Sequence, residues 1–127
     1  MINTILHVGL HVVKKDVKNF YSEILNCEII RTFILQPEDS YSIFGIKEKV
    51  QISYTSCGNI DLELFIGNKM ESPSFGHICL QSSEAEEIFR KASKKGYHTF
   101  IRKRNSGKAY FISDSNYNLF EIKTLNR

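Results

Sequence analysis

The chain has 127 residues, of which 42% are apolar and 24% charged, and its formal net charge is +3. This size and balance are typical of one compact globular domain. No apolar run is long enough for a transmembrane helix, which excludes membrane spanning by a helix. No recognition motif accompanies the charge, which argues against nucleic-acid binding, and the absence of a leader pattern predicts a cytoplasmic protein.

The first half of the chain predicts a strand, a helix and three further strands. Residues 5–13 predict the first strand, and Asp16 is a candidate N-cap. The apolar stripe of the helix is Val17, Phe20, Tyr21, Ile24 and Leu25. Further strands are predicted at 28–35, 50–55 and 60–66. Residues 36–40 predict a polar turn, and 41–46 fit either a short strand or a helical turn.

The second half repeats this order after a linker at 67–74. A strand is predicted at 75–81 and a helix at 83–95, in which Ser83 and Glu86 form a capping box. The inward stripe of this helix is Ala85, Ile88, Phe89 and Ala92, and Gly96 ends it. Three strands follow at 97–102, 108–113 and 118–124. The chain therefore reads as two copies of one unit.

Each copy has a histidine in its first strand and a glutamate in its last. The histidines are His7 and His77, which are 70 positions apart, and the glutamates are Glu63 and Glu121, which are 58 apart. A lone strand histidine is more often a core residue, and a lone strand glutamate usually faces solvent. Their joint occurrence in both copies instead favours one metal ion held by the two copies.

The cysteines and the basic clusters allow simpler interpretations. Cys27, Cys57 and Cys79 show no CxxC spacing and cannot all pair, which predicts a reducing compartment without a disulfide scaffold. Cys79 could line a pocket, although a small buried core residue is favoured. The basic clusters at 90–95 and 102–108 favour a solvated helix face plus a loop. The alternative is a rim that attracts an anionic substrate.

Four segments carry a resemblance to a known family. They are residues 6–10 (LHVGL), 62–65 (LELF), 76–80 (GHICL) and 111–114 (FISD) leading to 120–122 (FEI). With this order, the whole chain resembles the vicinal oxygen chelate superfamily, which includes glyoxalase I, bleomycin-resistance proteins and extradiol dioxygenases. The resemblance implies an α+β fold with two βαβββ modules, residues 1–67 and 75–127, that form an open, barrel-like curved sheet in a single domain.

The same resemblance implies a metal site and a homodimer. Its ligands would be His7, Glu63, His77 and Glu121, holding Ni, Co, Zn, Mn or Fe. Glu121 is the first candidate for the catalytic base and Glu63 its counterpart, while His11 is a rival base on the same strand face as His7. Sites shared between chains are expected, with a small molecule as substrate.

The implied activity is that of a metal-dependent lyase or isomerase of the glyoxalase I type, which stabilises an enediolate or enolate of a small 2-oxo compound or its thiol adduct. His11 stands where glutathione-dependent members have arginine, and Gly67 where they have asparagine, which argues against a glutathione substrate. The alternative is a non-catalytic antibiotic-binding protein of the bleomycin-resistance type. Fosfomycin-type enzymes rank third, because they typically use three metal ligands and an anion-binding set of lysine and arginine that the sequence does not reveal.

Overall fold

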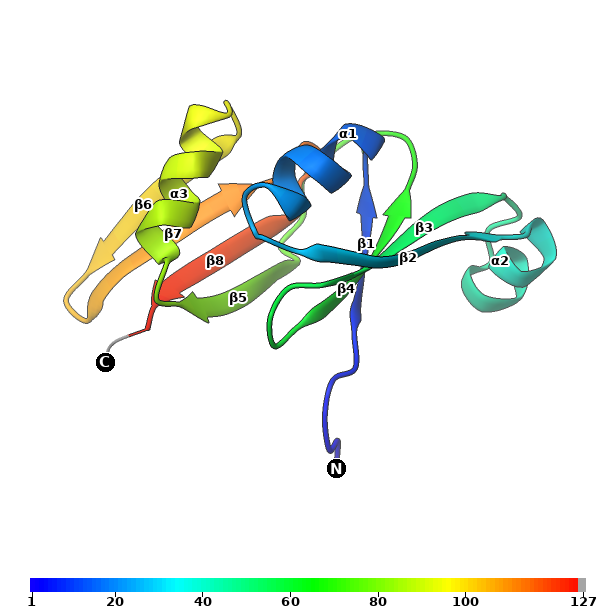
Figure 1. Cartoon of the computed structure of the whole chain (residues 1–127), viewed down its shortest axis with the longest axis horizontal. Helices are drawn as coiled ribbons and strands as arrows, with labels where there is room; N and C mark the ends of the chain where they lie inside the picture. Colours follow the sequence, from blue (N-terminus) through cyan, green and yellow to red (C-terminus); the bar gives the residue numbers. More distant parts are fainter. Residues whose placement is uncertain (126–127) are drawn as a thin grey trace. The chain divides into compact units, whose positions relative to one another are not determined.

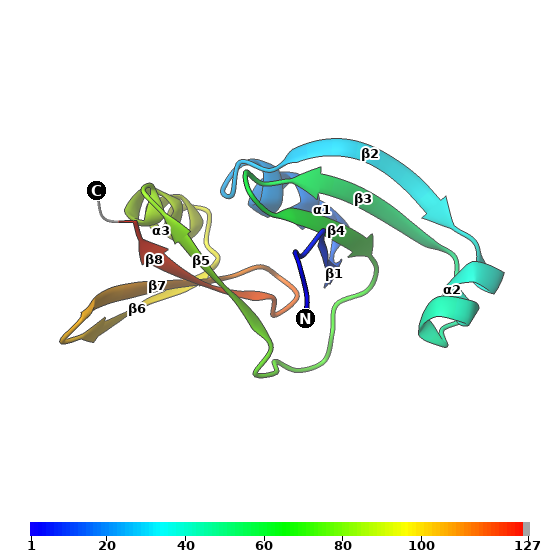
Figure 2. The same ribbon diagram turned by 90° about the horizontal axis from the view of Figure 1, so that it is seen from below.

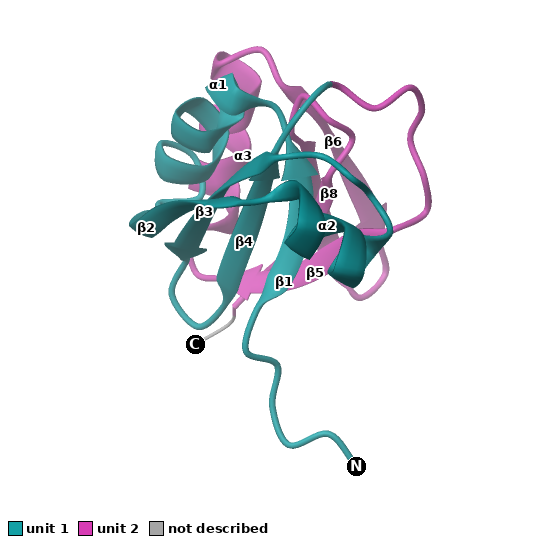
Figure 3. Ribbon diagram, turned by 90° about the vertical axis from the view of Figure 1, so that its right-hand side faces the viewer, with its two compact units in different colours: residues 1–68 teal, residues 69–127 magenta. Residues whose placement is uncertain are grey.

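The computed structural model describes residues 1–125, and the chain divides into two compact units, Met1–Asn68 and Lys69–Arg127 (Figure 3). Each unit contains one four-stranded mixed sheet. Among the described residues no helix is both long and apolar enough to cross a membrane.

The first unit has its sheet in the order β1-β4-β3-β2, in which β1 and β4 are parallel and the other pairs antiparallel (Figure 1). Its elements are β1 (Val8–Val12), α1 (Lys14–Asp16), the π-helix η1 (Val17–Ser22), β2 (Glu28–Leu35), α2 (Pro37–Phe44), β3 (Val50–Ser56) and β4 (Asp61–Ile66). The first strand is shorter than predicted, because its ladder to β4 begins at Val8. His7 therefore lies directly before the strand.

The second unit repeats this topology with the sheet order β5-β8-β7-β6, and β5 is parallel to β8. Its elements are β5 (His77–Ser82), α3 (Ala85–Lys94), β6 (His98–Arg104), β7 (Gly107–Ser113) and β8 (Leu119–Thr124). Helix α3 lies along one face of the sheet, where Ala85 and Ala92 are buried (Figure 1). The predicted order of strand, helix and three strands is thus present in both units.

Each sheet buries one face under its helix and leaves the other face to carry polar groups. In the first unit Phe20, Tyr21 and Ile24 are fully buried, as are Leu62 and Leu64 of β4. Each such side chain stabilises the fold by about 1.5–3 kcal/mol. Three residues of the predicted stripe, Val17, Phe20 and Tyr21, are buried on η1, which is a π-helix, whereas Ile24 and the half-buried Leu25 follow its end. Glu63 alternates with Leu62 and Leu64 and so lies on the opposite face of the sheet.

The predicted starts of both helices following the first strands were wrong. Asp16 is not an N-cap, because the extended residue is Val13 and α1 begins at Lys14. The capping box of Ser83 and Glu86 is also not formed, since α3 begins at Ala85 after Glu84. Glu84 instead donates its backbone N–H to the Ser82 hydroxyl, at 3.0 Å.

Residues 36–40, predicted as a polar turn, begin helix α2. Pro37 occupies the first turn, where its missing N–H costs no hydrogen bond, and Glu38 and Asp39 favour the positive end of the helix dipole. Gly45 ends the helix in the left-handed conformation, with φ of 73°. The ambiguous residues 41–46 are therefore mainly helical. Figure 2 shows α2 beyond the far ends of β2 and β3.

The cysteines also differ from the prediction. Cys27 and Cys57 form a disulfide, although their spacing predicted none. The last ladder pair of β2 and β3 is Glu28 with Ser56, so Cys27 and Cys57 are the next opposed pair. Cys79, predicted to be buried, is an exposed free thiol. The disulfide removes the cysteine argument for a reducing compartment.

Candidate metal centre

The first candidate ligand pair lies on the open face of the first sheet. Gly9 of β1 is opposite Glu63 of β4, so His7, two residues before Gly9, shares the face of Glu63. The His7 Nε2 atom is 3.5 Å from the Glu63 Oε1 atom. The side chains are 42% and 18% exposed, respectively, and so both remain accessible to a ligand.

The second unit has the same arrangement at its equivalent positions. Cys79 is opposite Glu121, and His77 Nε2 is 3.6 Å from Glu121 Oε1. The side chains of His77 and Glu121 are 44% and 21% exposed, close to the values of the first pair. The structure therefore brings each predicted histidine to its predicted glutamate, in the same geometry twice.

A contact on the other ring nitrogen of His77 favours metal binding. The Nδ1 atom lies 3.0 Å from the carbonyl oxygen of Phe75. Because a carbonyl only accepts hydrogen bonds, this contact calls for a proton on Nδ1, and in the neutral ring with that tautomer Nε2 carries the lone pair. Metal-binding histidines commonly use this arrangement, which also fixes the orientation of the ring.

Neither pair forms a complete site within its own unit. Among residues 1–125 no group of three or more histidine, cysteine, aspartate or glutamate side chains is arranged to hold a metal. Two ligands leave most of the coordination sphere of a divalent ion to water. Each unit thus contains two of the four predicted ligands.

The surroundings of the first pair are polar. Tyr54 is opposite Glu63 on β3, and its ring meets the His7 ring edge-on with centroids 5.7 Å apart. Its hydroxyl donates to Asp61 Oδ2 at 2.9 Å, and the Arg31 guanidinium lies over the ring at 4.6 Å. The hydrogen bond to Asp61 raises the pKa of Tyr54 above its ordinary value, so the phenol stays protonated at neutral pH.

The surroundings of the second pair are apolar at the equivalent positions. Phe111 is opposite Glu121 and stacks on Phe100, with centroids 4.8 Å apart and planes inclined by 11°. Leu119 is opposite His77 at the start of the β5–β8 ladder, whereas β4 of the first unit begins with Asp61. The two copies thus share the ligand pair but differ in the residues that support it.

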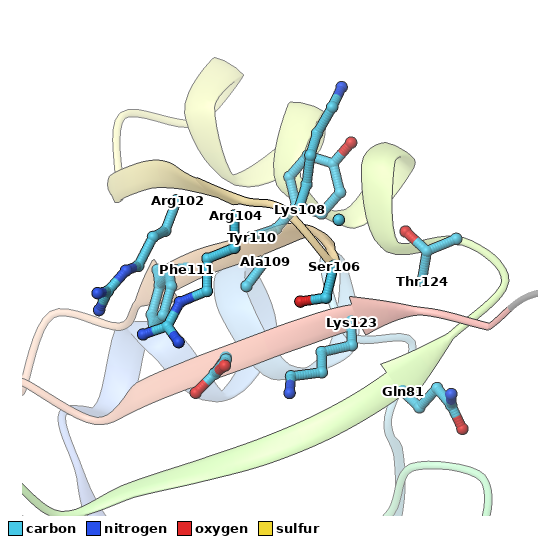
Figure 4. Close-up of a pocket in the computed structure, with 12 residues that line it drawn as sticks. Gln81, Arg102, Arg104, Ser106, Lys108, Ala109, Tyr110, Phe111, Lys123 and Thr124 are labelled. Carbon is cyan, nitrogen blue, oxygen red and sulfur yellow. The ribbon is translucent and has the colours of Figure 1, made fainter.

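A basic pocket adjoins Glu121 in the second unit. Its volume is about 690 Å³, and Arg102, Arg104 and Lys123 line it with Glu121 (Figure 4). In Figure 4 these three basic side chains lie on one side of the sheet, whereas Lys108 points to the other side. The predicted loop over 102–108 is wrong in part, because β6 extends to Arg104. Strand alternation at residues 102 and 104 is the signal that could have revealed this pocket.

The rival base, His11, lies elsewhere on the open face of the first unit. It shares that face with His7 and Gly9, and its ring lies against Gly67, so that a Cβ atom at position 67 would meet the His11 Nε2 atom. The two departures from the glutathione-dependent pattern are therefore in contact. Where glutathione-dependent members have arginine and asparagine, this chain has the His11 imidazole packed against the backbone of Gly67.

A buried aspartate holds the turn that leads into β8 and Glu121. Asp114 is 6% exposed, and its Oδ1 atom accepts the backbone N–H groups of Asn116 at 2.8 Å and Asn118 at 2.9 Å. Its Oδ2 atom accepts the side-chain amide of Asn118 at 2.8 Å. This carboxylate therefore replaces backbone partners that the turn cannot supply.

Asp114→Asn is expected to lower the free energy of unfolding by about 1–2 kcal/mol, since a neutral amide oxygen is a weaker acceptor than a carboxylate. Urea unfolding would measure the loss. Glu71→Gln, at an exposed loop position, is the control and should change stability by less than about 0.5 kcal/mol. Equal stability of both variants would contradict this role of Asp114.

No family model matches the sequence, and no curated protein matches it. Solved structures do match the fold. The fosfomycin resistance protein FosX from Listeria monocytogenes, complexed with Mn(II) and sulfate, has a TM-score of 0.75 at 20% identity, covering 99% of this chain and 93% of that one. Another structure of a mutant of that protein holds Mn(II) and 1S,2S-dihydroxypropylphosphonic acid.

Two further structures are similar over nearly the full length. FosX from Mesorhizobium loti has a TM-score of 0.72 at 16% identity, covering 99% of this chain and 94% of that one. A glyoxalase family protein from Enterococcus faecalis has a TM-score of 0.71 at 23% identity, covering 95% and 97%. The chain therefore shares the fold of these FosX and glyoxalase family structures, and the predicted α+β glyoxalase-like fold is confirmed.

Proposed function

We propose that this chain is a metal-dependent enzyme that acts on a small anionic substrate, with His7, Glu63, His77 and Glu121 as the ligands. The observation that carries the proposal is the repeated His–Glu pair, at 3.5 and 3.6 Å, on the open face of each sheet. The structural neighbours crystallised with Mn(II) support a divalent ion in this fold. We also propose a homodimer in which each site receives one pair from each kind of unit.

The donor atoms fit such an ion. Two ligands that each lie about 2.0–2.2 Å from one ion are roughly 2.8–3.1 Å apart at an octahedral angle and roughly 3.3–3.6 Å apart at a tetrahedral angle. The observed separations between imidazole nitrogen and carboxylate oxygen, 3.5 and 3.6 Å, match the tetrahedral distances. Imidazole and carboxylate together suit Mn, Fe, Co, Ni or Zn. A bound divalent ion would supply Lewis-acid polarisation of a substrate carbonyl or phosphoryl oxygen.

The chain's own residues would hold the substrate and move a proton. Arg102, Arg104 and Lys123 line the pocket beside Glu121 and suit a phosphonate, phosphate or carboxylate group. Glu121, next to this pocket, is the proposed base that removes a proton from the carbon adjoining a carbonyl. Glu63 is the proposed acid that returns a proton. This is the chemistry of a lyase or isomerase, and the basic pocket favours an anionic substrate over a neutral one.

Hydrogen exchange in deuterated water tests this function. Mn²⁺-loaded protein is mixed with small 2-oxo acids such as pyruvate, and NMR follows the replacement of the C–H protons beside the carbonyl. Arg102→Gln is expected to raise KM about tenfold, because it removes one charge-assisted contact worth about 1.4 kcal/mol. Arg90→Gln is the matched control, since Arg90 pairs with Glu87 on α3 and does not line the pocket.

The outcomes separate an enzyme from a binding protein. Exchange that requires the metal and weakens in Arg102→Gln alone would support the proposal. Binding of metal and anion without exchange for any acid tested would instead indicate a non-catalytic small-molecule-binding protein. Equal effects of Arg102→Gln and Arg90→Gln on KM would show that the basic pocket does not bind the substrate.

A further inference from the structure

We propose that a pocket in the first unit, beneath α2, binds an apolar, aryl-sized group of the substrate. The pocket has a volume of about 490 Å³ and lies between α2 with its following loop and the strands β1 and β4. The lining side chains that matter here are Phe44, Ile46, Val50, Phe65 and His11. Pockets of about 300–1,000 Å³ with mainly apolar walls are typical of small-molecule sites.

Two residues that line the pocket, Gly9 and Phe65, are neighbours of Glu63 in the β1–β4 ladder. Phe65 lies two residues beyond Glu63 on β4 and so shares its face, and Gly9 lies directly opposite Glu63. A Cβ atom at Gly9 would come within 3.2 Å of Phe65 Cε1, so the missing side chain keeps this floor open. An apolar group in the pocket would therefore be a near neighbour of one proposed ligand.

Two aromatic rings form the wall below α2. Phe44, the last residue of α2, meets Phe65 edge-on, with ring centroids 5.3 Å apart and planes inclined by 81°. Edge-to-face pairs of this kind present a ring face and a ring edge to a further aromatic group. An aromatic group of a ligand could therefore pack against Phe44 and Phe65 as the third ring of an aromatic cluster.

The apolar character belongs to this unit and is not a general property of the repeated fold. The residue two places beyond the ligand glutamate is Phe65 in the first unit and Lys123 in the second. The second unit has no counterpart of α2, because β6 and β7 join in a tight hairpin between Arg104 and Gly107. The position two residues beyond the ligand glutamate is thus apolar in the first unit and basic in the second.

The exposure of the lining indicates a ligand. Phe44 is 50% exposed and Ile46 is 53% exposed, which leaves apolar surface in water around a concave site. Such clustered exposure commonly marks a binding site. Glu48 and Lys49 line the same pocket with opposite charges, so these two side chains give its lining no net charge. A neutral aryl group of a small molecule is the occupant that matches this size and charge.

Assigning the pocket to the substrate rests on the proposed function, whereas its affinity for an aryl group does not. The test therefore uses metal-free protein and the neutral fluorescent probe N-phenylnaphthylamine, with indole as competitor. The chain contains no tryptophan, which keeps the protein background low. Phe44→Asp is expected to weaken probe binding about tenfold, through loss of roughly 1.4 kcal/mol of aromatic contact.

Ile43→Asp is the matched control. Ile43 precedes Phe44 on α2 and is 64% exposed, but it does not line the pocket. Retained affinity in Ile43→Asp and lost affinity in Phe44→Asp, with equal Tm, would support the proposal. Equal losses in both variants, or unchanged binding in Phe44→Asp, would overturn the proposal. A lower oligomeric mass of Phe44→Asp by light scattering would also overturn it, because it would indicate an interface between copies of the chain.

The metal-loaded enzyme then separates this proposal from the proposed function. If the function holds, 2-oxo acids with a phenyl substituent should have a KM at least about tenfold lower than pyruvate, and Phe44→Asp should remove that advantage. Equal KM values with and without the phenyl group would reject the substrate assignment while leaving exchange of pyruvate intact. Probe binding without any exchange would instead reject the enzyme and retain the pocket.

Discussion

His7→Ala and Glu121→Ala are each expected to lower the affinity for Mn²⁺ by at least about a hundredfold, although the two residues belong to different units. Each pair alone supplies two ligands, and neither unit holds a third within its described residues. Loss of the supporting partner of a ligand already costs 10–100-fold in affinity, so loss of a ligand should cost more. Titration calorimetry and elemental analysis would measure affinity and stoichiometry.

The stoichiometry distinguishes one shared site from two separate ones. A shared site predicts one ion per chain, and either single variant should lose that ion completely. The double variant should then show no further loss of metal. Independent pairs predict two weak ions, of which each variant loses one. His98→Ala is the control, because His98 lies on a sheet strand without a glutamate partner of this kind. A full loss in His98→Ala would show nonspecific damage.

Removal of the Cys27–Cys57 disulfide is expected to lower the free energy of unfolding by about 3 kcal/mol. The bond closes a sequence separation of 30 residues, and cross-links of this length typically stabilise by 2–4 kcal/mol because they restrict the unfolded chain. The variant carries Cys27→Ser and Cys57→Ser together. Its urea midpoint should fall by about 1–3 M, given the usual slope for small proteins.

Cys79→Ser is the control and should leave the midpoint unchanged, since Cys79 is an exposed free thiol. Dithiothreitol should lower the midpoint of the wild-type protein to that of the double variant and leave the double variant unaffected. An unchanged wild-type midpoint under reduction would show that the bond contributes nothing to stability.

Repetition is the feature that made the fold predictable. The alternation of Leu62 and Leu64 with Glu63 fixed which face of β4 is buried, and the second copy repeated the pattern around Glu121. Parallel pairing of the first and last strand of each copy then places each histidine beside its glutamate. Each His–Glu pair could therefore be predicted, because the alternation of apolar and polar residues in the sequence shows which side chains share a face of the sheet.

The features that could not be predicted depend on longer-range pairing or on competing local signals. Cys27 and Cys57 form a disulfide because the β2–β3 register places them opposite one another. The spacing between the two cysteines in the sequence does not reveal that register. Residues 36–40 have turn composition, yet Pro37, Glu38 and Asp39 are equally suited to a first helical turn. The surroundings of the pairs also required the register, since Arg31 reaches Tyr54 only across strands.

The coexistence of one disulfide and one exposed thiol affects how the protein must be handled. A thiol reductant that protects Cys79 from oxidation during purification would also open the Cys27–Cys57 bond at the end of the β2–β3 ladder. Thiol reductants also bind divalent ions of the borderline class and would compete in every metal titration. Cys79→Ser protein, purified without reductant, is therefore the form in which stability and metal affinity can be measured together.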